Sequence, residues 1–141
     1  MPEFYTTLDV SQTWWSDFSF KAERENRINP LDGSLHADNP LKDTWAVCAG
    51  MEYLFVFSKT EIPLRGGLAW EQRPAVGNPD DYYSLSAGSG FSVGKGPGKT
   101  IVDIAYILTH ASDIQGIVPE QSGLHSDVTE HQVFVSCIKR F

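Results

Sequence analysis

The chain has 141 residues, a net charge of -7 at neutral pH, and 12% aromatic residues. This length suits one domain with a core of its own, and the acidic charge disfavours a nucleic-acid partner, because phosphates would repel such a surface. No apolar run approaches the roughly 18 residues that a membrane-spanning helix needs, so a helical membrane protein is excluded.

Six segments of the chain alternate between large apolar and small or polar residues with a period of two. This period is typical of β-strands, and no segment keeps a helical period long enough to compete. The sequence therefore predicts an all-β chain of about six strands. The segments, in chain order, are Phe4–Phe20, Thr44–Phe57, Ile62–Glu71, Tyr82–Gly94, Thr100–His110 and Val128–Phe141.

The connections between these segments alternate strictly between long and short. Residues 21–43, 72–81 and 111–127 form long polar connections, whereas SKT at 58–60 and KGPGK at 95–99 are short. In an up-and-down antiparallel sheet, this order places all long loops at one end of the strands and all short turns at the other end. Bacterial outer-membrane barrels sort their loops in this way. We therefore expect a segment of an up-and-down transmembrane β-barrel, an open curved sheet when taken alone, with long loops extracellular and the carboxy terminus periplasmic.

The two faces of each predicted strand differ in character. In the second segment, one face carries Trp45, Met51, Tyr53 and similar side chains, and the other carries small residues and Glu52. Alternation alone does not say which face is outside, so a soluble lipocalin-like barrel with an apolar interior also fits.

Aromatic residues favour the membrane alternative because they gather at both strand ends, as two interfacial girdles would. The alternative is a protein core with aromatic rims. The expected girdle comprises Trp45, Trp70, Tyr82 and Tyr83 at the long-loop ends and Phe55, Phe57, Phe91 and Phe141 at the short-turn ends. The charged residues that we expect to face the lumen, as charge pairs or as a simply solvated wall, are Asp9, Glu52, Arg65, Glu71, Asp103 and Arg140.

Sequence signals for catalysis are weak. His131 and Ser136 fall on opposite faces of one predicted strand, so they do not form a base and nucleophile pair. GKGPGKT at 94–100 leads into a strand where a phosphate-binding loop requires a helix, so we interpret it as a hairpin turn. We expect no enzymatic activity and no cofactor.

Metal binding is also weakly signalled. Asp80 and Asp81 could bind a divalent ion from an external loop, but Asn-Pro-Asp-Asp favours a type I turn. Cys48 and Cys137 lack metal-ligand spacing, and we interpret both as small wall residues.

Four stretches carry a family resemblance. Residues 50–95 (GMEYLFVFSKTEIPLRGGLAWEQRPAVGNPDDYYSLSAGSGFSVGK), IVDIAYI at 101–107, EHQVFVSCIKRF at 130–141 and LDVSQTWWSDFSFK at 8–21 resemble the carboxy-terminal part of FadL/TodX-type outer-membrane transport proteins. The match runs through essentially the whole chain in the expected order.

The resemblance implies a monomeric barrel of about fourteen strands, closed by an amino-terminal hatch, that passes long-chain fatty acids or other hydrophobic molecules through the outer membrane. Residues 1–141 would supply the last six strands, with the signal peptide, hatch and earlier strands absent. It also implies that the strand ending in Phe141 is recognised by the barrel-assembly machinery. A barrel that has a structural role without transport remains an alternative.

Overall fold

The computed structural model describes residues 2–17, 20–21, 27–28, 41–75, 78–94, 98–114 and 126–139. These residues form one six-stranded sheet and one two-stranded sheet. The strands are β1 (Glu3–Thr13), β2 (Phe20–Lys21), β3 (Arg27–Ile28), β4 (Thr44–Val56), β5 (Thr60–Arg73), β6 (Asp80–Val93), β7 (Thr100–Ile114) and β8 (Ser126–Lys139).

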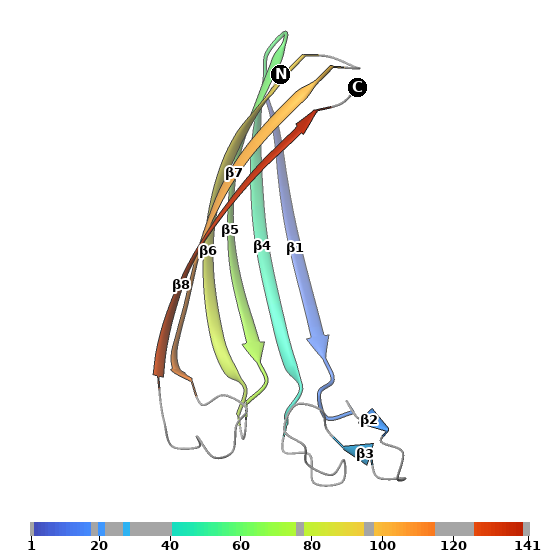
Figure 1. Cartoon of the computed structure of the whole chain (residues 1–141), viewed down its shortest axis with the longest axis vertical. Coiled ribbons are helices and arrows are strands. Elements are labelled where there is room, and N and C mark those ends of the chain that lie inside the picture. Colours follow the sequence, from blue (N-terminus) through green and yellow to red (C-terminus); the bar gives the residue numbers. More distant parts are fainter. Residues whose placement is uncertain are drawn as a thin grey trace.

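The large sheet has the order β1-β4-β5-β6-β7-β8, and all five ladders are antiparallel. Along the chain, each strand of this sheet pairs with the next strand of the same sheet. The strands β2 and β3 come between β1 and β4 in the chain and pair with each other beyond the end of β1 (Figure 1). The predicted all-β, up-and-down architecture of six strands is confirmed. The sheet is curved and open, with β1 and β8 at its two edges (Figure 1).

The short turns lie together at one end of the sheet, as the sequence predicts. The backbone N–H of Phe57 donates to the carbonyl of Thr60 at 2.8 Å and closes the β4–β5 turn. The N–H of Gly94, directly after β6, donates to the carbonyl of Lys59 at 3.3 Å, so the end of β6 is bonded to the β4–β5 turn. Gly94 and Gly98 both have φ of 97°, a conformation that glycine adopts without steric cost.

The first predicted strand is too long. β1 ends at Thr13, and residues 14–17 turn away from the sheet instead of continuing to Phe20. The backbone N–H of Trp15 donates to the carbonyl of Thr13, and the amide and hydroxyl of Ser16 both donate to Asp43 Oδ1, at 3.1 and 2.7 Å. Side-chain hydrogen bonds of this kind compete with the ladder and end the strand.

The remaining boundaries differ by a few residues. β5, β6 and β7 extend beyond the predicted segments, and β7 continues to Ile114 through a register shift after Ala111. The shift includes Asp113, which has φ of 60°. The predicted turn at Asp80 and Asp81 is wrong, because both residues begin β6 and pair with Arg73 and Gln72 of β5.

The registers of the five ladders align the side chains of neighbouring strands, so the sheet has two distinct faces. What we call the apolar face includes Phe4, Leu8 and Val10 of β1, Trp45, Val47, Met51, Tyr53 and Phe55 of β4, Leu64, Leu68 and Trp70 of β5, Tyr83, Leu85 and Phe91 of β6, Ile104, Tyr106 and Leu108 of β7, and Val133 and Val135 of β8. The opposite face, called the polar face, includes Thr7, Asp9, Cys48, Gly50, Glu52, Arg65, Gly67, Ala69, Glu71, Ser84, Ser86, Gly88, Asp103, Ala105, Glu130 and Gln132.

Hardly any apolar side chain is buried between elements. Among the described residues, the buried apolar residues are Leu41, Pro63, Ala75, Tyr82 and Ala111. On the apolar face, by contrast, Leu8 is 74% exposed and Leu68 is 64% exposed. The described strands of the large sheet therefore form a single layer, with no second layer of described residues against its apolar side.

Asp43, directly before β4, accepts hydrogen bonds from Ser16, which follows β1. The hydroxyl and amide of Ser16 hold the pKa of this carboxyl below its ordinary value of 3.8. A carboxyl with a lowered folded-state pKa stabilises the fold above its unfolded pKa, and that stabilisation is lost as pH falls through the folded-state pKa.

We therefore expect the Ser16 amide to lose protection from hydrogen exchange as pH falls below about 3.8, because the protonated carboxyl is a weaker acceptor. An Asp43→Ala variant, which has no side-chain acceptor, should show low protection of this amide at every pH. The Tyr82 amide, inside the sheet, is the internal control. Equal protection of Ser16 in both proteins across the range would contradict the assigned role of Asp43.

Candidate functional site

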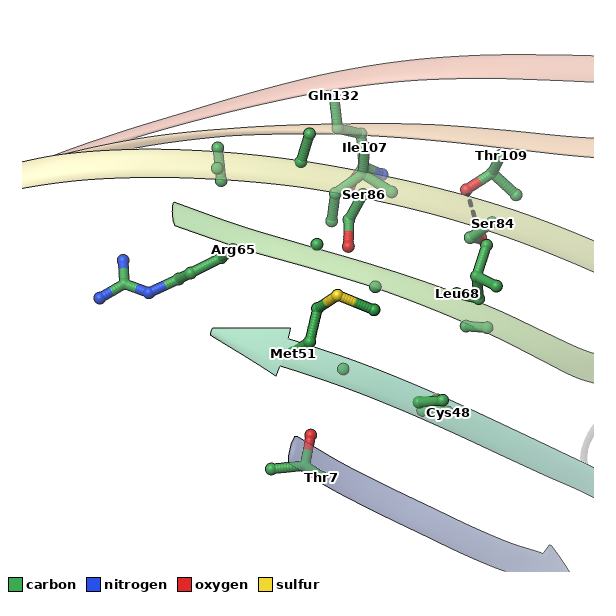
Figure 2. Close-up of a pocket in the computed structure, with 18 of the residues that line it drawn as sticks. Thr7, Cys48, Met51, Arg65, Leu68, Ser84, Ser86, Ile107, Thr109 and Gln132 are labelled. Carbon is green, nitrogen blue, oxygen red and sulfur yellow. Dashed lines mark hydrogen bonds between the residues drawn. The ribbon is translucent and has the colours of Figure 1, made fainter. Parts of the chain in front are cut away.

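The polar face carries a hollow of about 680 Å³ over the middle of the sheet (Figure 2). Its floor consists of residues with side chains no larger than a methyl or hydroxymethyl group. The floor residues are Gly50, Gly67, Ala69, Ser84, Ser86, Gly88 and Ala105, from β4 to β7. Since the ladders bring small residues of β4, β5 and β6 side by side at Gly50, Gly67 and Ser86, the hollow follows from the sequence pattern and the register together.

Little space is left for a side chain at two glycines in this region. A Cβ atom on Gly67 would lie 2.8 Å from the Ser86 hydroxyl and 3.2 Å from the carbonyl oxygen of Ala49. A Cβ atom on Gly90 would lie 2.5 Å from both an Asp103 carboxylate oxygen and the carbonyl oxygen of Val102. Gly90 therefore leaves the space that the Asp103 side chain occupies.

An ion-pair cluster borders the hollow toward the short-turn end. Arg65 of β5 donates from Nε to Glu52 of β4 at 2.5 Å and from Nη1 to Asp103 of β7 at 2.7 Å. β6 runs between β5 and β7, and its residue opposite Arg65 is Gly88. The guanidinium thus reaches across a whole strand because no side chain stands in its way. We call these three residues the Arg65 cluster.

A second ion pair borders the hollow toward the long-loop end. Arg73 pairs with Glu71 at 2.7 Å, and its guanidinium carbon lies 3.9 Å from the centre of the Tyr82 ring. This distance is typical of a cation-π contact. Arg73, Tyr82 and Glu130 border the polar face but were absent from the residues that the sequence predicts to face the lumen.

The predicted lumen-facing residues are brought together only in part. Glu52, Arg65 and Asp103 meet in one cluster, while Glu71 pairs with Arg73 instead. Asp9 lies on the same face opposite Cys48. Arg140 lies outside the described residues.

The predicted girdle residues occupy several environments. Trp70 and Tyr83 are direct cross-strand partners on the apolar face, and Trp70 Nε1 donates to Asp81 at 3.1 Å. The rings of Tyr53 and Phe55, near the short turns, contact edge to face at 4.7 Å.

The other girdle residues are more dispersed. Trp45 is the partner of Gln12, Phe91 is the partner of Val102, and Phe57 follows the end of β4. Tyr82 is buried on the polar face, beneath Arg73. Phe141 lies outside the described residues.

Groups with catalytic or metal-binding potential are dispersed. His131 and Ser136 lie on opposite faces of β8, and His131 Nδ1 is 2.6 Å from the Tyr106 hydroxyl. Cys48 and Cys137 are free thiols, the first in the hollow and the second on the opposite side of the sheet. The part of the chain that the structure describes contains no cluster of three or more metal-ligating side chains and no helix long and apolar enough to cross a membrane.

Comparisons with models of protein families, with curated proteins and with solved structures found no match.

Gly90 offers a test of the close approach between β6 and β7. We expect Gly90→Ala to destabilise the folded sheet by about 1–3 kcal/mol, because the added methyl group meets the carbonyl oxygen of Val102 as well as a side chain. The matched control is Gly66→Ala, where the nearest atoms would lie at 3.8 and 4.0 Å. Denaturant unfolding in detergent measures both. Equal stability of the two variants would contradict the close packing at Gly90.

Proposed function

We propose that this chain forms adjacent strands of a larger bacterial outer-membrane β-barrel that passively admits hydrophobic small molecules, long-chain fatty acids foremost. The observation that carries the proposal is the continuous apolar face, which extends over all six strands and has no layer of described residues against it. The resemblance of the sequence to FadL/TodX-type proteins supports the same function.

The exposure of the apolar face is the first support. Soluble monomers rarely expose contiguous apolar patches larger than a few hundred Å². Here the exposed residues run from Leu8 on β1 through Leu68 and Leu85 to Val135 on β8, so the patch extends from edge to edge. Hydrocarbon chains of a bilayer would cover such a surface without a specific partner.

The height of the apolar face is the second support. On β4 it runs from Val47 to Phe55, which is nine residues. A tilted strand crosses the hydrocarbon core with about 9–11 residues. Trp70 and Tyr83 border the face toward the long loops, beside Gln72 and Asp81, as expected where hydrocarbon meets water.

The position of the hollow distinguishes this proposal from a soluble lipocalin-like barrel. Such a barrel would enclose its apolar side chains. In this sheet the hollow lies on the polar face, where glycine, serine and ion pairs line it together with Ile107. A polar interior surrounded by an apolar exterior is the arrangement of outer-membrane barrels.

The two edges support membership of a larger barrel. β1 and β8 each have one ladder among the described strands, so one side of each backbone is unpaired there. Lipid cannot satisfy those N–H and C=O groups. Further strands on either side would complete the ladders and close the wall.

Leu85 and Ser86 are adjacent residues on opposite faces, so they form a matched pair for testing which face meets lipid. In a complete barrel that contains this sequence, reconstituted in lipid vesicles, we expect Leu85→Arg to destabilise the folded state by about 2–4 kcal/mol and Ser86→Arg to cost much less, because the second guanidinium would enter a water-filled hollow. Denaturant titration of vesicle-bound protein measures both. Folding of the unmodified chain in water without detergent or lipid would overturn the membrane proposal.

Transport requires a test in cells. A complete barrel containing this sequence should restore uptake of a radiolabelled long-chain fatty acid to a bacterium that lacks its own outer-membrane transporter. A copy that carries the paired substitution Leu68→Asp and Leu85→Asp should fail to assemble and serves as the negative control. Normal assembly of the unaltered barrel without uptake would favour a structural role.

A further inference from the structure

We propose that a narrow apolar stripe on the polar face binds the hydrocarbon chain of a long-chain fatty acid inside the barrel. This surface, which we call the interior stripe, consists of Ile101 and Ile107 of β7 and Phe134 and Ile138 of β8. The inference rests on the proposed function, because it gives the admitted molecule a place on the inner wall. It adds the strands and the side chains that the molecule contacts there.

The β7–β8 ladder places the interior stripe on the same side of the sheet as the hollow. Ile101 is the direct partner of Ile138, and Phe134 is the direct partner of Ala105. Ala105 and Ile107 both line the hollow. Residues two positions apart on a strand share a face, so all four stripe residues face away from the lipid side of the sheet. The stripe therefore begins at the hollow and continues toward the short turns.

The stripe residues are accessible on this face. Phe134 is 52% exposed and Ile138 is 51% exposed, while Ile101 and Ile107 are half-buried. The inner surface of an outer-membrane barrel is generally polar and faces water. Removing apolar surface from water is favourable in proportion to the area covered. A hydrophobic molecule that lies on the stripe is therefore stabilised there.

Asp103 lies on the same face of β7 between two stripe residues, but its carboxylate is drawn away from β8. It accepts a hydrogen bond from Arg65 of β5 at 2.7 Å, across the intervening strand β6. The β8 partner of Asp103 is Ser136, which is uncharged. The stripe is therefore interrupted along β8 by a single hydroxyl group.

The dimensions of the stripe suit one hydrocarbon chain. Ile101 and Ile107 are six residues apart, which is about 20 Å along a strand and comparable with an extended long-chain fatty acid. The stripe is two strands wide. On the same face, β6 carries only glycine and serine from Ser84 to Ser92. A broader covering layer of protein would meet no apolar side chain on β6, so a single chain fits this surface better than a protein segment does.

Cysteine alkylation tests the site in a complete barrel that contains this sequence, reconstituted in lipid vesicles. The reporter is Ser136→Cys, which leaves the four stripe residues unchanged, in a background with Cys48→Ala and Cys137→Ala. A water-soluble maleimide measures the rate of alkylation with and without a long-chain fatty acid. Ser11→Cys in the same background is the matched control, because Ser11 is exposed on the polar face of β1, at the other edge of the sheet.

We expect a saturating long-chain fatty acid to slow alkylation at position 136 at least about tenfold, because only the unoccupied site reacts. Alkylation at position 11 should not change. Butyrate at the same concentration should give no protection, since its short chain covers little apolar surface. Adding Phe134→Ser and Ile138→Ser to the reporter should raise the half-protecting concentration of the long-chain acid about tenfold.

The outcomes separate this site from the proposed function. If the fatty acid does not slow alkylation at position 136, or slows it equally at position 11, the interior stripe is not the binding site and the proposed function stands. Slow alkylation at position 136 without fatty acid would also overturn the site, because another part of the barrel would then cover the stripe.

The natural Cys137 tests the proposed function itself, because it is adjacent to Ser136 and lies on the opposite face of β8. In a barrel that carries Cys48→Ala alone, lipid should shield this thiol from the water-soluble reagent. Alkylation of Cys137 as fast as that at position 11 would mean that the apolar face meets water, and it would overturn both proposals.

Discussion

The structure depends on the register of its ladders. Each ladder pairs residues so that side chains on one side of a strand meet side chains on the same side of the next strand, and this holds through five successive pairings. A slip of one residue in any ladder would turn every large apolar side chain of the next strand toward the hollow. Both the apolar face and the polar face therefore exist only because all five registers agree.

The same register gives the Arg65 cluster its shape. Arg65 lies opposite Glu52 on one side and opposite Gly88 on the other, while Gly90 lies opposite Asp103. The two glycines of β6 let an arginine on β5 and an aspartate on β7 meet above the strand that separates them. Each pair is partly exposed, with 46% of the Arg65 side chain accessible, so water screens it and its contribution to stability is small. The greater effect of the cluster is on charge, because the two carboxylates neutralise the Arg65 guanidinium.

Strand positions, strand order and the sorting of turns could be predicted from the sequence because they depend on alternation and on connection length. The residues that lie on each face could be predicted from the alternation of side chains along a strand. Strand ends were less predictable. Trp15, Ser16 and Asp43 end β1 through contacts between residues 27 positions apart in sequence, and no local pattern encodes them. The burial of Tyr82 beneath Arg73 likewise depends on the β5–β6 register.

The nearest-neighbour order of the large sheet bears on how such a protein can change through evolution. Every ladder of the large sheet joins strands that follow one another in the chain, except that the small pair β2–β3 comes between β1 and β4. A hairpin of two strands can therefore be duplicated or lost without breaking any ladder other than the one at the junction. A pair of strands returns the chain to the end of the sheet from which it started. The gain or loss of a hairpin therefore keeps the short turns at one end of the strands and the long loops at the other. Gene duplication in units of one hairpin would thus widen or narrow the wall while preserving its sidedness.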